Sequence, residues 1–431
     1  MSSGANVAGV GADVAGAQAN VASARPSGTL GSALPAALLV LTFALLGGCS
    51  EPRANPVQAR LSLLETLAGA DTAGYARATE PRAFDFPRDH GPHPDFRTEW
   101  WYVTGNLTAS DGRDFGFQLT IFRSALSPAP PATESAWGTN QAYMAHFTVT
   151  DVADGRFRAY ERFARGAAGL AGATAEPLRV WLEGWAIESV DTATAPGAPQ
   201  GDGRAADSEA FPLRLRAAED DVALDLVLER GKPAVLQGDR GLSQKGPEPG
   251  NASFYYSHTR LPASGTLALG TDTAAVRGLA WLDREWSTSA LGEGQVGWDW
   301  FALQLSDGWD LMVYRLRRAD GSADALSAGV LVDPQGQSTP LDASVAAALE
   351  STDTWTSPVD GAVYPSGWRV RVPSRGWDLQ VEPRVRAQEL DLAFRYWEGT
   401  VSVRGTGEAG VPVTGRGYVE LTGYAGERPR R

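Results

Sequence analysis

The segment from residue 281 to residue 286, which reads WLDREW, places two acidic side chains beside an indole. On a strand, Trp281, Asp283 and Glu285 would share one side, and the residues between them would face the other. Desolvation and repulsion between like charges both raise the pKa of a carboxyl. A carboxyl that is neutral at physiological pH can donate a proton to an alkene, a carbonyl or a leaving group. We therefore predict Asp283 and Glu285 as catalytic residues, one of which is the neutral acid; the structural alternative pairs one of them with an arginine such as Arg260.

A second aromatic segment, GWDWFALQL, follows closely and carries Trp298 and Trp300. On a strand these two indoles share a face. They could line an apolar ligand pocket, and they could equally be ordinary core residues. An acid next to aromatic residues recurs at Glu99-Trp100-Trp101, a repetition that fits side chains lining a cavity.

The four histidines offer polar groups but no recognisable metal site. His90 and His93 lie in one loop with two aspartates, at a spacing that fits no standard zinc site. His146 and His258 lie in strand-like segments, where each could contact a ligand or form a buried structural hydrogen bond. The sequence therefore predicts no metal.

Common catalytic signatures are absent from the sequence. It holds no G-x-S-x-G motif, no Walker loop and no G-x-G-x-x-G after a strand. Cys49 is the single cysteine, so no internal disulfide can form. The formal net charge of -13 repels phosphate backbones and argues against nucleic acid as a partner.

The cysteine follows an apolar run from Leu38 to Leu46 that is too short to span a bilayer and is typical of a signal peptide. The tetrad that ends at Cys49, Leu-Gly-Gly-Cys, resembles the bacterial lipobox, in which the cysteine is lipidated. Two acyl signals suffice for stable membrane attachment. We expect an exported, periplasm-facing protein with a lipid anchor, and Ser50 favours the outer membrane. The alternative is a plain secretory peptide with an incidental cysteine.

The elements that position these residues are predicted to be antiparallel strands. From Phe84 onward, hydrophobicity alternates with period two, and Asp-Gly, the preferred type I′ hairpin dipeptide, occurs six times. The best local helix candidate is Leu341–Leu349. This pattern predicts an all-β barrel or sandwich.

Two hairpins with similar Trp clusters indicate a weak internal repeat and hence two β-domains in tandem. We place the change between them near Pro262–Thr273, where glycines flank a short strand. The predicted organisation is a signal peptide, a lipidated N-terminus with spacer, an N-terminal β-domain and a C-terminal β-domain, over residues 1–48, 49–83, 84–265 and 266–431.

Several segments together resemble the AttH-like family, which is related to hydroxyneurosporene synthase, the carotenoid 1,2-hydratase. The resemblance covers nearly everything from Phe84 to Tyr424 and rests on EWWYVTGNL, FGFQLTIFR, YMAHFTVTDV, LQGDRGLSQKG, NASFYYSHTRL, WLDREWS, GWDWFALQL and GYVELTGY. It implies two tandem lipocalin-like antiparallel barrels that enclose an apolar cavity.

In the hydratase relatives, water is added to an isolated double bond without a cofactor, and an aspartate is the proposed proton donor. The position that matches this aspartate is Asp283, and Trp281, Trp286 and Tyr256 match aromatic positions. The histidine of the hydratase site aligns with Phe254, a departure that bears on carotenoid hydration itself.

The combined expectation is a cofactor-independent enzyme that acts on a hydrophobic isoprenoid or polyene substrate. Asp283 is the acid, and Glu285 tunes it or positions water. Two alternatives stay open: a non-catalytic carrier of lipids or other apolar ligands, and a secreted hydrolase. The residues expected to contact the substrate are Trp101, His146, Tyr256, His258, Trp281, Trp286, Trp298 and Trp300.

Overall fold

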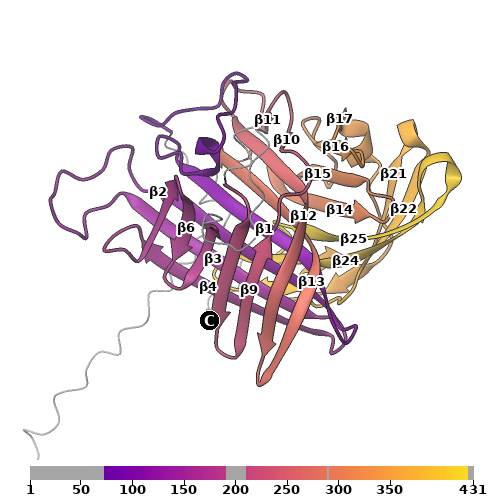
Figure 1. The fold of residues 1–431 in the computed structure, drawn as a ribbon. Helices are drawn as coiled ribbons and strands as arrows, with labels where there is room; N and C mark the ends of the chain where they lie inside the picture. The colour runs from indigo at the N-terminus through magenta and orange to yellow at the C-terminus, as the bar shows by residue number, and fades with distance from the viewer. Residues whose placement is uncertain (1–71, 191–209, 289–290, 426–431) are drawn as a thin grey trace, which may run out of the picture. The chain divides into compact units, whose positions relative to one another are not determined.

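The computed structural model describes residues 72–190, 210–288 and 291–425 (Figure 1). Their regular secondary structure consists almost entirely of antiparallel strands, which confirms the predicted all-β fold. Cys49, the signal segment and most of the spacer lie outside the described residues. Among the residues that are described, none of the helices has the length and apolar character that crossing a bilayer requires.

The first sheet contains 13 strands and nearly closes into a barrel. Its two edges approach each other, since β4 contacts β6 and the Arg162 guanidinium of β4 lies 2.6 Å from the Glu219 carboxylate of β8. The short strands β10 (Val235–Leu236) and β11 (Leu242–Gln244) pair with β12. The main path runs through β4 (Arg156–Arg165), β3 (Gln141–Asp151), β2 (Asp114–Ala125), β1 (Thr98–Ala109), β13 (Asp272–Ser287), β12 (Ala252–Leu269), β9 (Val222–Leu228), β8 (Leu213–Glu219), β7 (Trp185–Ser189), β6 (Leu178–Leu182) and β5 (Ala171–Ala175).

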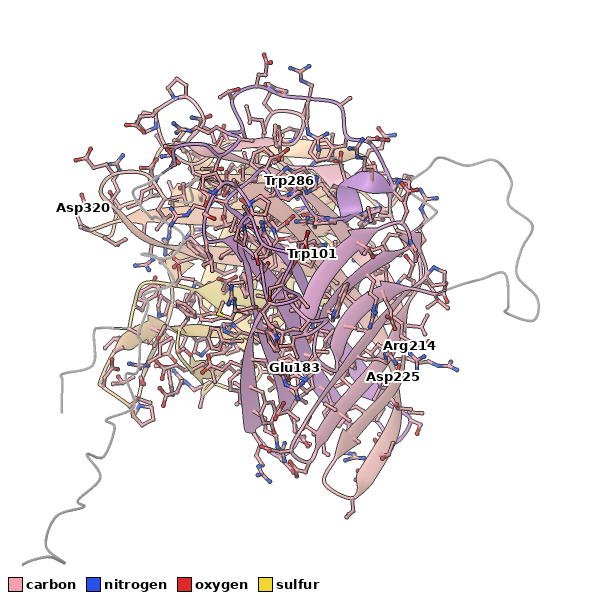
Figure 2. All side chains as sticks on the ribbon, turned by 90° about the vertical axis from the view of Figure 1, so that its left-hand side faces the viewer. Trp101, Glu183, Arg214, Asp225, Trp286 and Asp320 are labelled. Carbon is pink, nitrogen blue, oxygen red and sulfur yellow. The ribbon has the colours of Figure 1, made fainter. Side chains whose placement is uncertain are left out.

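Hairpin turns at Asp-Gly dipeptides join neighbouring strands of this barrel, as predicted, but they are not of type I′, because Asp111 and Asp154 lack the positive φ that this type requires. Gly112, between β1 and β2, has a φ of 87°, and Gly155, between β3 and β4, has a φ of 64°. Glycine adopts these left-handed values without the Cβ clash that other residues meet. In Figure 2, Trp101 and Trp286 lie among the enclosed side chains, whereas Arg214 and Asp225 lie at the outer surface.

The second sheet contains ten strands, and a separate two-stranded sheet pairs β19 (Thr354–Thr356) with β20 (Val363–Pro365). The helix α3 (Ala343–Ala347) confirms the predicted helical stretch, and Asp342 caps it by accepting the Ser344 N–H. Short 3-10 helices span Arg88–His90, Pro373–Arg375 and Glu408–Gly410. The second sheet runs through β17 (Ser338–Leu341), β16 (Ala328–Val332), β15 (Asp310–Arg318), β14 (Gln295–Leu305), β25 (Pro412–Leu421), β24 (Arg395–Thr406), β22 (Trp377–Pro383), β21 (Trp368–Val372) and β18 (Glu350–Ser351), with β23 (Glu389–Asp391) beside β24.

The change from the first sheet to the second lies later in the chain than residue 265, where we expected a domain boundary. Strand β13 pairs along its whole length with β12 and over much of it with β1, so it belongs to the barrel. The second sheet begins with β14 at Gln295. The glycine-rich stretch near Gly270 is thus a hairpin within the barrel, between β12 and β13.

One outer face of the barrel packs against the second sheet. Tyr102 of β1, Tyr255 of β12 and Trp281 of β13 form one apolar cluster with Trp300 of β14 and Tyr418 of β25. These barrel strands are therefore buried on both faces, one toward the barrel interior and one toward the second sheet. The candidate site lies at this second face.

Candidate active site

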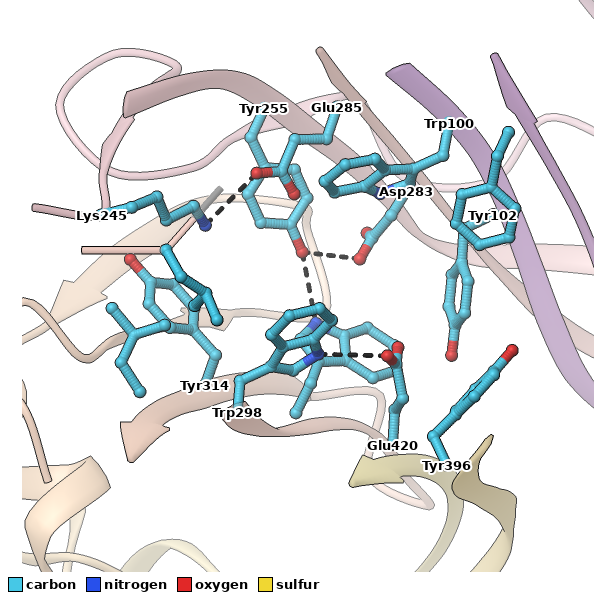
Figure 3. Close-up of a pocket in the computed structure, with 14 residues that line it drawn as sticks. Trp100, Tyr102, Lys245, Tyr255, Asp283, Glu285, Trp298, Tyr314, Tyr396 and Glu420 are labelled. Atoms are coloured by element: carbon cyan, nitrogen blue, oxygen red, sulfur yellow. Dashed lines mark hydrogen bonds and ion pairs between the residues drawn. The ribbon is translucent and has the colours of Figure 1, made fainter. Parts of the chain in front are cut away.

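A hollow between the barrel and the second sheet brings together acids and aromatic rings (Figure 3). It measures about 90 Å³ for the centres of water-sized spheres. One water needs roughly 10–15 Å³ on that measure, so several waters or part of an apolar ligand would fit. The lining side chains are those of Trp100, Tyr102, Phe122, Lys245, Tyr255, Asp283, Glu285, Leu291, Trp298, Trp300, Tyr314, Leu316, Tyr396 and Glu420.

Asp283 is buried in the wall that β12 and β13 supply, and three groups donate hydrogen bonds to its carboxyl. One oxygen accepts from the Tyr255 hydroxyl at 2.6 Å; the other accepts from the Ser257 hydroxyl at 2.5 Å and the Trp281 indole N–H at 2.7 Å. Ser257 lies directly opposite Asp283 in the strand register, so the backbone pairing fixes this contact.

Burial raises the pKa of Asp283 to about 7, from an ordinary value of 3.8. The three hydrogen bonds stabilise the carboxylate and oppose this effect, whereas the nearby charge of Glu285 adds to it. Arg260 does not offset the burial, because it donates instead to Asp310, at 2.7 and 2.9 Å. The arrangement therefore holds an acid that is largely protonated just below neutral pH, and the arginine-paired alternative does not apply to it.

Glu285 lies on the same side of β13 but has a cationic partner. The Lys245 ammonium lies 3.3 Å from its carboxylate and 4.5 Å from the centre of the Tyr314 ring. Burial is the largest single influence and would lower the pKa of Lys245, but the charge of Glu285, its hydrogen bond and the nearby Tyr314 and Asp283 together outweigh it, so the pKa is raised. Glu285 is thus ion-paired, and its chemistry differs from that of Asp283.

Two further acids come from the second sheet. The Trp298 indole donates to Glu420 at 3.1 Å, and the Tyr102 hydroxyl donates to Glu398 at 2.6 Å. Glu398 and Glu420 lie directly opposite each other on β24 and β25. Burial is the main cause that raises the pKa of both carboxyls well above the ordinary range, and the mutual repulsion of the pair adds to it. Figure 3 shows the Glu420 carboxyl on the wall that faces Asp283.

The predicted residues fall on two sides of the barrel wall. Asp283, Glu285, Trp298 and Trp300 line the hollow, and Trp281 lies behind it, where its indole holds Asp283. The strand alternation predicted for WLDREW is therefore observed.

Four other predicted residues face the barrel interior instead. The Trp101 indole donates to the His90 carbonyl at 2.8 Å, and the Tyr256 hydroxyl lies 2.6 Å from the His90 ring nitrogen Nδ1. Trp286 belongs to the same interior cluster, and the His258 ring packs 5.9 Å from that of Tyr256. Trp101, Tyr256, His258 and Trp286 therefore do not line the hollow beside Asp283, and their role as substrate contacts stays a prediction. The reason is strand parity, because odd and even residues of β12 and β13 point to opposite faces.

His146 is buried beside the hollow rather than in it. Its Nδ1 lies 2.7 Å from the Tyr396 hydroxyl, and Tyr396 does line the hollow. Burial lowers the pKa of His146 to about 3, so the ring is neutral at physiological pH. Its role in this structure is to hold Tyr396.

The histidines of the N-terminal loop are held by other side chains. His93 bonds to Asp89 through Nε2 at 3.1 Å and to Glu99 through Nδ1 at 3.3 Å, and its ring stacks on Trp286 with centroids 3.7 Å apart. Glu99 also pairs with Arg284. Within residues 72–190, 210–288 and 291–425, no three His, Cys, Asp or Glu side chains gather as metal ligands.

Sequence reasoning missed Tyr255, Lys245, Tyr102 and Glu420 as pocket residues. A signal for Glu420 was present, since GYVELTGY places an acid two residues after Tyr418 on one strand face. Nothing in the sequence indicates that this terminal strand faces β13. Lys245 lies in an irregular stretch with no periodicity to orient it.

Comparison with known proteins identifies a family and solved structures that are similar to this chain. The AttH-like family matches residues 77–424. A Nitrosomonas europaea crystal structure assigned to AttH is 35% identical, with a TM-score of 0.67, over 81% of this chain and all of that one. Kievitone hydratase from Nectria haematococca shares the fold at 16% identity and a TM-score of 0.57, over 79% of this chain and 93% of its own. No curated protein matches the sequence. The chain belongs to the AttH-like family.

Proposed function

We propose that the chain is a hydratase-type enzyme that adds water to a carbon–carbon double bond of an apolar substrate, with Asp283 as the proton donor. The observation that carries this proposal is the buried Asp283 carboxyl, which accepts hydrogen bonds from three neutral donors and faces an aromatic hollow. The fold shared with kievitone hydratase supports the reaction class. An acyclic isoprenoid or polyene fits the apolar walls.

The reaction begins when the neutral Asp283 carboxyl transfers its proton to one alkene carbon. The π bond breaks, a C–H bond forms, and the second carbon becomes a carbocation. The faces of Trp298 and Trp300 offer negative charge density to this cation, as aromatic faces do to other cations. The Tyr255, Ser257 and Trp281 donors stabilise the carboxylate that is left behind.

Water then completes the addition. Its oxygen bonds to the cationic carbon, and the resulting oxonium returns a proton to the Asp283 carboxylate, which regenerates the acid. The sum is alkene plus water to alcohol, without an oxidant or reductant. The same steps in reverse dehydrate a tertiary alcohol.

The Lys245–Glu285 pair keeps the end of the hollow near Asp283 electrically balanced. An unpaired ammonium would repel the cationic intermediate, and an unpaired carboxylate would raise the pKa of Asp283 further. Glu285 thus positions Lys245 and tunes the acid, rather than donating the proton itself.

We further propose that the mature protein is a lipoprotein, acylated at Cys49 and held at the periplasmic side of the envelope. The support is the apolar run before Cys49 and the lipobox-like tetrad that ends there. Metabolic labelling with a radioactive fatty acid tests it, because label should enter the wild-type chain and not the Cys49→Ser variant.

The function is tested by incubating the purified protein with acyclic isoprenoid alkenes, among them squalene and lycopene, in water enriched in ¹⁸O. We expect an alcohol that carries one ¹⁸O, formed by the wild type and not by Asp283→Asn. Asp225→Asn is the matched control, since Asp225 pairs with Arg214 on the outer surface. Tight retention of such alkenes without conversion would contradict the enzyme and favour a carrier.

A further inference from the structure

The loop between β2 and β3 is an apolar surface feature that the proposed reaction does not use. All its residues from 126 to 138 are exposed, including Leu126 at 65% and Trp137 at 58%. The stretch LSPAPPATESAWGT holds one charged residue, Glu134, although charged residues make up 21% of the chain. Large exposed apolar groups with so little charge are typical of interaction surfaces.

A neighbouring turn extends this surface. The Ala168 N–H donates to the Ala136 carbonyl at 3.0 Å, which ties the β4–β5 turn to the loop. That turn presents Leu170, which is 37% exposed. We call Leu126, Trp137 and Leu170 the apolar rim.

The N-terminal part of the described chain runs beside the apolar rim. The Tyr75 hydroxyl donates to the Ala125 carbonyl at 3.0 Å, and a Cβ added at Gly74 would lie 2.9 Å from Pro128. Residues 1–71, which precede this point, contain the apolar run and Cys49 of the proposed lipid anchor. The described chain therefore begins beside the rim.

The candidate active site lies at the end of β1 and β2 from which the loop of the apolar rim extends. Trp100 and Phe122 are paired across β1 and β2, and both line the hollow. Leu126 follows Phe122 by four residues, a chain length of at most about 14 Å. A surface that covers the rim would thus lie close to the hollow.

We infer that the apolar rim docks on a lipid bilayer and holds the hollow near the membrane from which an apolar substrate is drawn. The bilayer fits the rim because Leu, Trp and Pro side chains enter the interface at little cost, and Trp favours that depth in particular. The transfer of substrate rests on the proposed function, but the docking itself does not.

The test uses the full-length protein bound to phosphatidylcholine vesicles whose acyl chains carry bromine, which quenches tryptophan on contact. The emission of Trp137 is obtained as the difference between the wild type and Trp137→Phe, a variant that keeps an apolar ring. We expect this difference emission to be lost in brominated vesicles and kept in unbrominated ones. Trp355→Phe, on β19, is the control and should give a difference emission that bromine leaves unchanged.

A second measurement removes the contribution of the anchor. Full-length Cys49→Ser carries no acyl chain, and adding Leu126→Asp and Trp137→Ser should weaken its binding to the same vesicles at least about tenfold. Adding Val411→Asp instead, at a 60% exposed position in the turn before β25, should not. Unquenched Trp137 on bound protein, or equal binding of both variants, would overturn the docking. Asp283→Asn should dock normally, so failure of the reaction and failure of docking are distinguishable.

Discussion

Burial makes ionisation of the Asp283 carboxyl costly, and three hydrogen-bond donors stabilise the carboxylate that ionisation forms. Burial raises its pKa, and the donors limit that rise to a value of about 7. A catalytic acid works best when its pKa lies near the operating pH, because it is then both protonated and able to release its proton. At the scale of single residues, this balance is the property that the proposed reaction needs.

Asp283→Asn should lower kcat for alkene hydration by roughly 10²–10⁴-fold, the usual contribution of a positioned acid. The amide has nearly the same shape but no acidic proton. Steady-state kinetics on the substrate found by ¹⁸O incorporation measure the change. Turnover close to that of the wild type would remove Asp283 from the mechanism.

The kcat/KM of the wild type should be constant at low pH and fall about tenfold per unit above pH 7, because only the protonated acid donates. Ser257→Ala removes a hydrogen bond that stabilises the carboxylate, so the pKa of Asp283 should rise further. The descending limb of the pH profile should therefore move to higher pH. A limb that moves to lower pH would contradict the assignment.

Folding stability should depend on the same group. The folded protein holds the Asp283 proton up to about pH 7, whereas the unfolded chain releases it near pH 3.8. The contribution of this proton to the free energy of unfolding is therefore complete below pH 3.8 and is lost as the pH rises to 7. Asp283→Asn should therefore be more stable than the wild type at pH 8, by up to about 4 kcal/mol, and nearly equal to it at pH 3.5. Urea unfolding at the two pH values measures the difference in free energy of unfolding between the variant and the wild type. A variant that is less stable than the wild type at pH 8 would contradict a costly buried charge on Asp283.

At the scale of elements, the alternation of side chains along each strand decides which residues face the site. The alternation within WLDREW could be predicted from the sequence, and the structure has it as predicted. The same alternation on β12 places Tyr255 at the hollow and Tyr256 in the barrel. Both residues belong to one aromatic run with both strand faces buried, so hydrophobicity could not show which face carries the site.

Phenylalanine substitutions at these adjacent positions separate the two faces. Tyr255→Phe removes a donor to Asp283 and should shift the descending limb of the pH profile upward. Tyr256→Phe removes the contact with His90 inside the barrel; it should cost about 1 kcal/mol of folding free energy and leave the pH profile unchanged. Equal pH shifts in both variants would contradict the assigned faces.

At the scale of the whole molecule, the site exists because two sheets share it. The barrel supplies Asp283 and Tyr255, and the second sheet supplies Trp298, Trp300 and Glu420. The sequence predicted the strands and the Asp-Gly hairpins. It could not predict which faces of the two sheets meet, because that contact joins separate strands, such as those of Tyr102 and Glu398, which are 296 positions apart, and leaves no local pattern.

A buried ionic cluster also joins the sheets. The Asp310 carboxylate of β15 accepts from Lys232 at 2.8 Å and from Arg260 of β12 at 2.7 Å. Asp310→Asn would leave two largely buried cations without their counter-charge and should destabilise the protein by about 3–5 kcal/mol. Asp225→Asn breaks an exposed pair and should cost less than about 1 kcal/mol. Denaturant unfolding of both variants tests this, and equal losses would show that the cluster does not hold the sheets together.

The central claim, that Asp283 is an uncharged acid near neutral pH, is tested most directly by infrared titration. The C=O stretch of a protonated carboxyl is followed against pH, and the Asp283 band is obtained as the difference between the wild type and Asp283→Asn. We predict a band that persists at pH 6 and disappears with a midpoint near pH 7. A midpoint near the ordinary value of 3.8 would contradict the account.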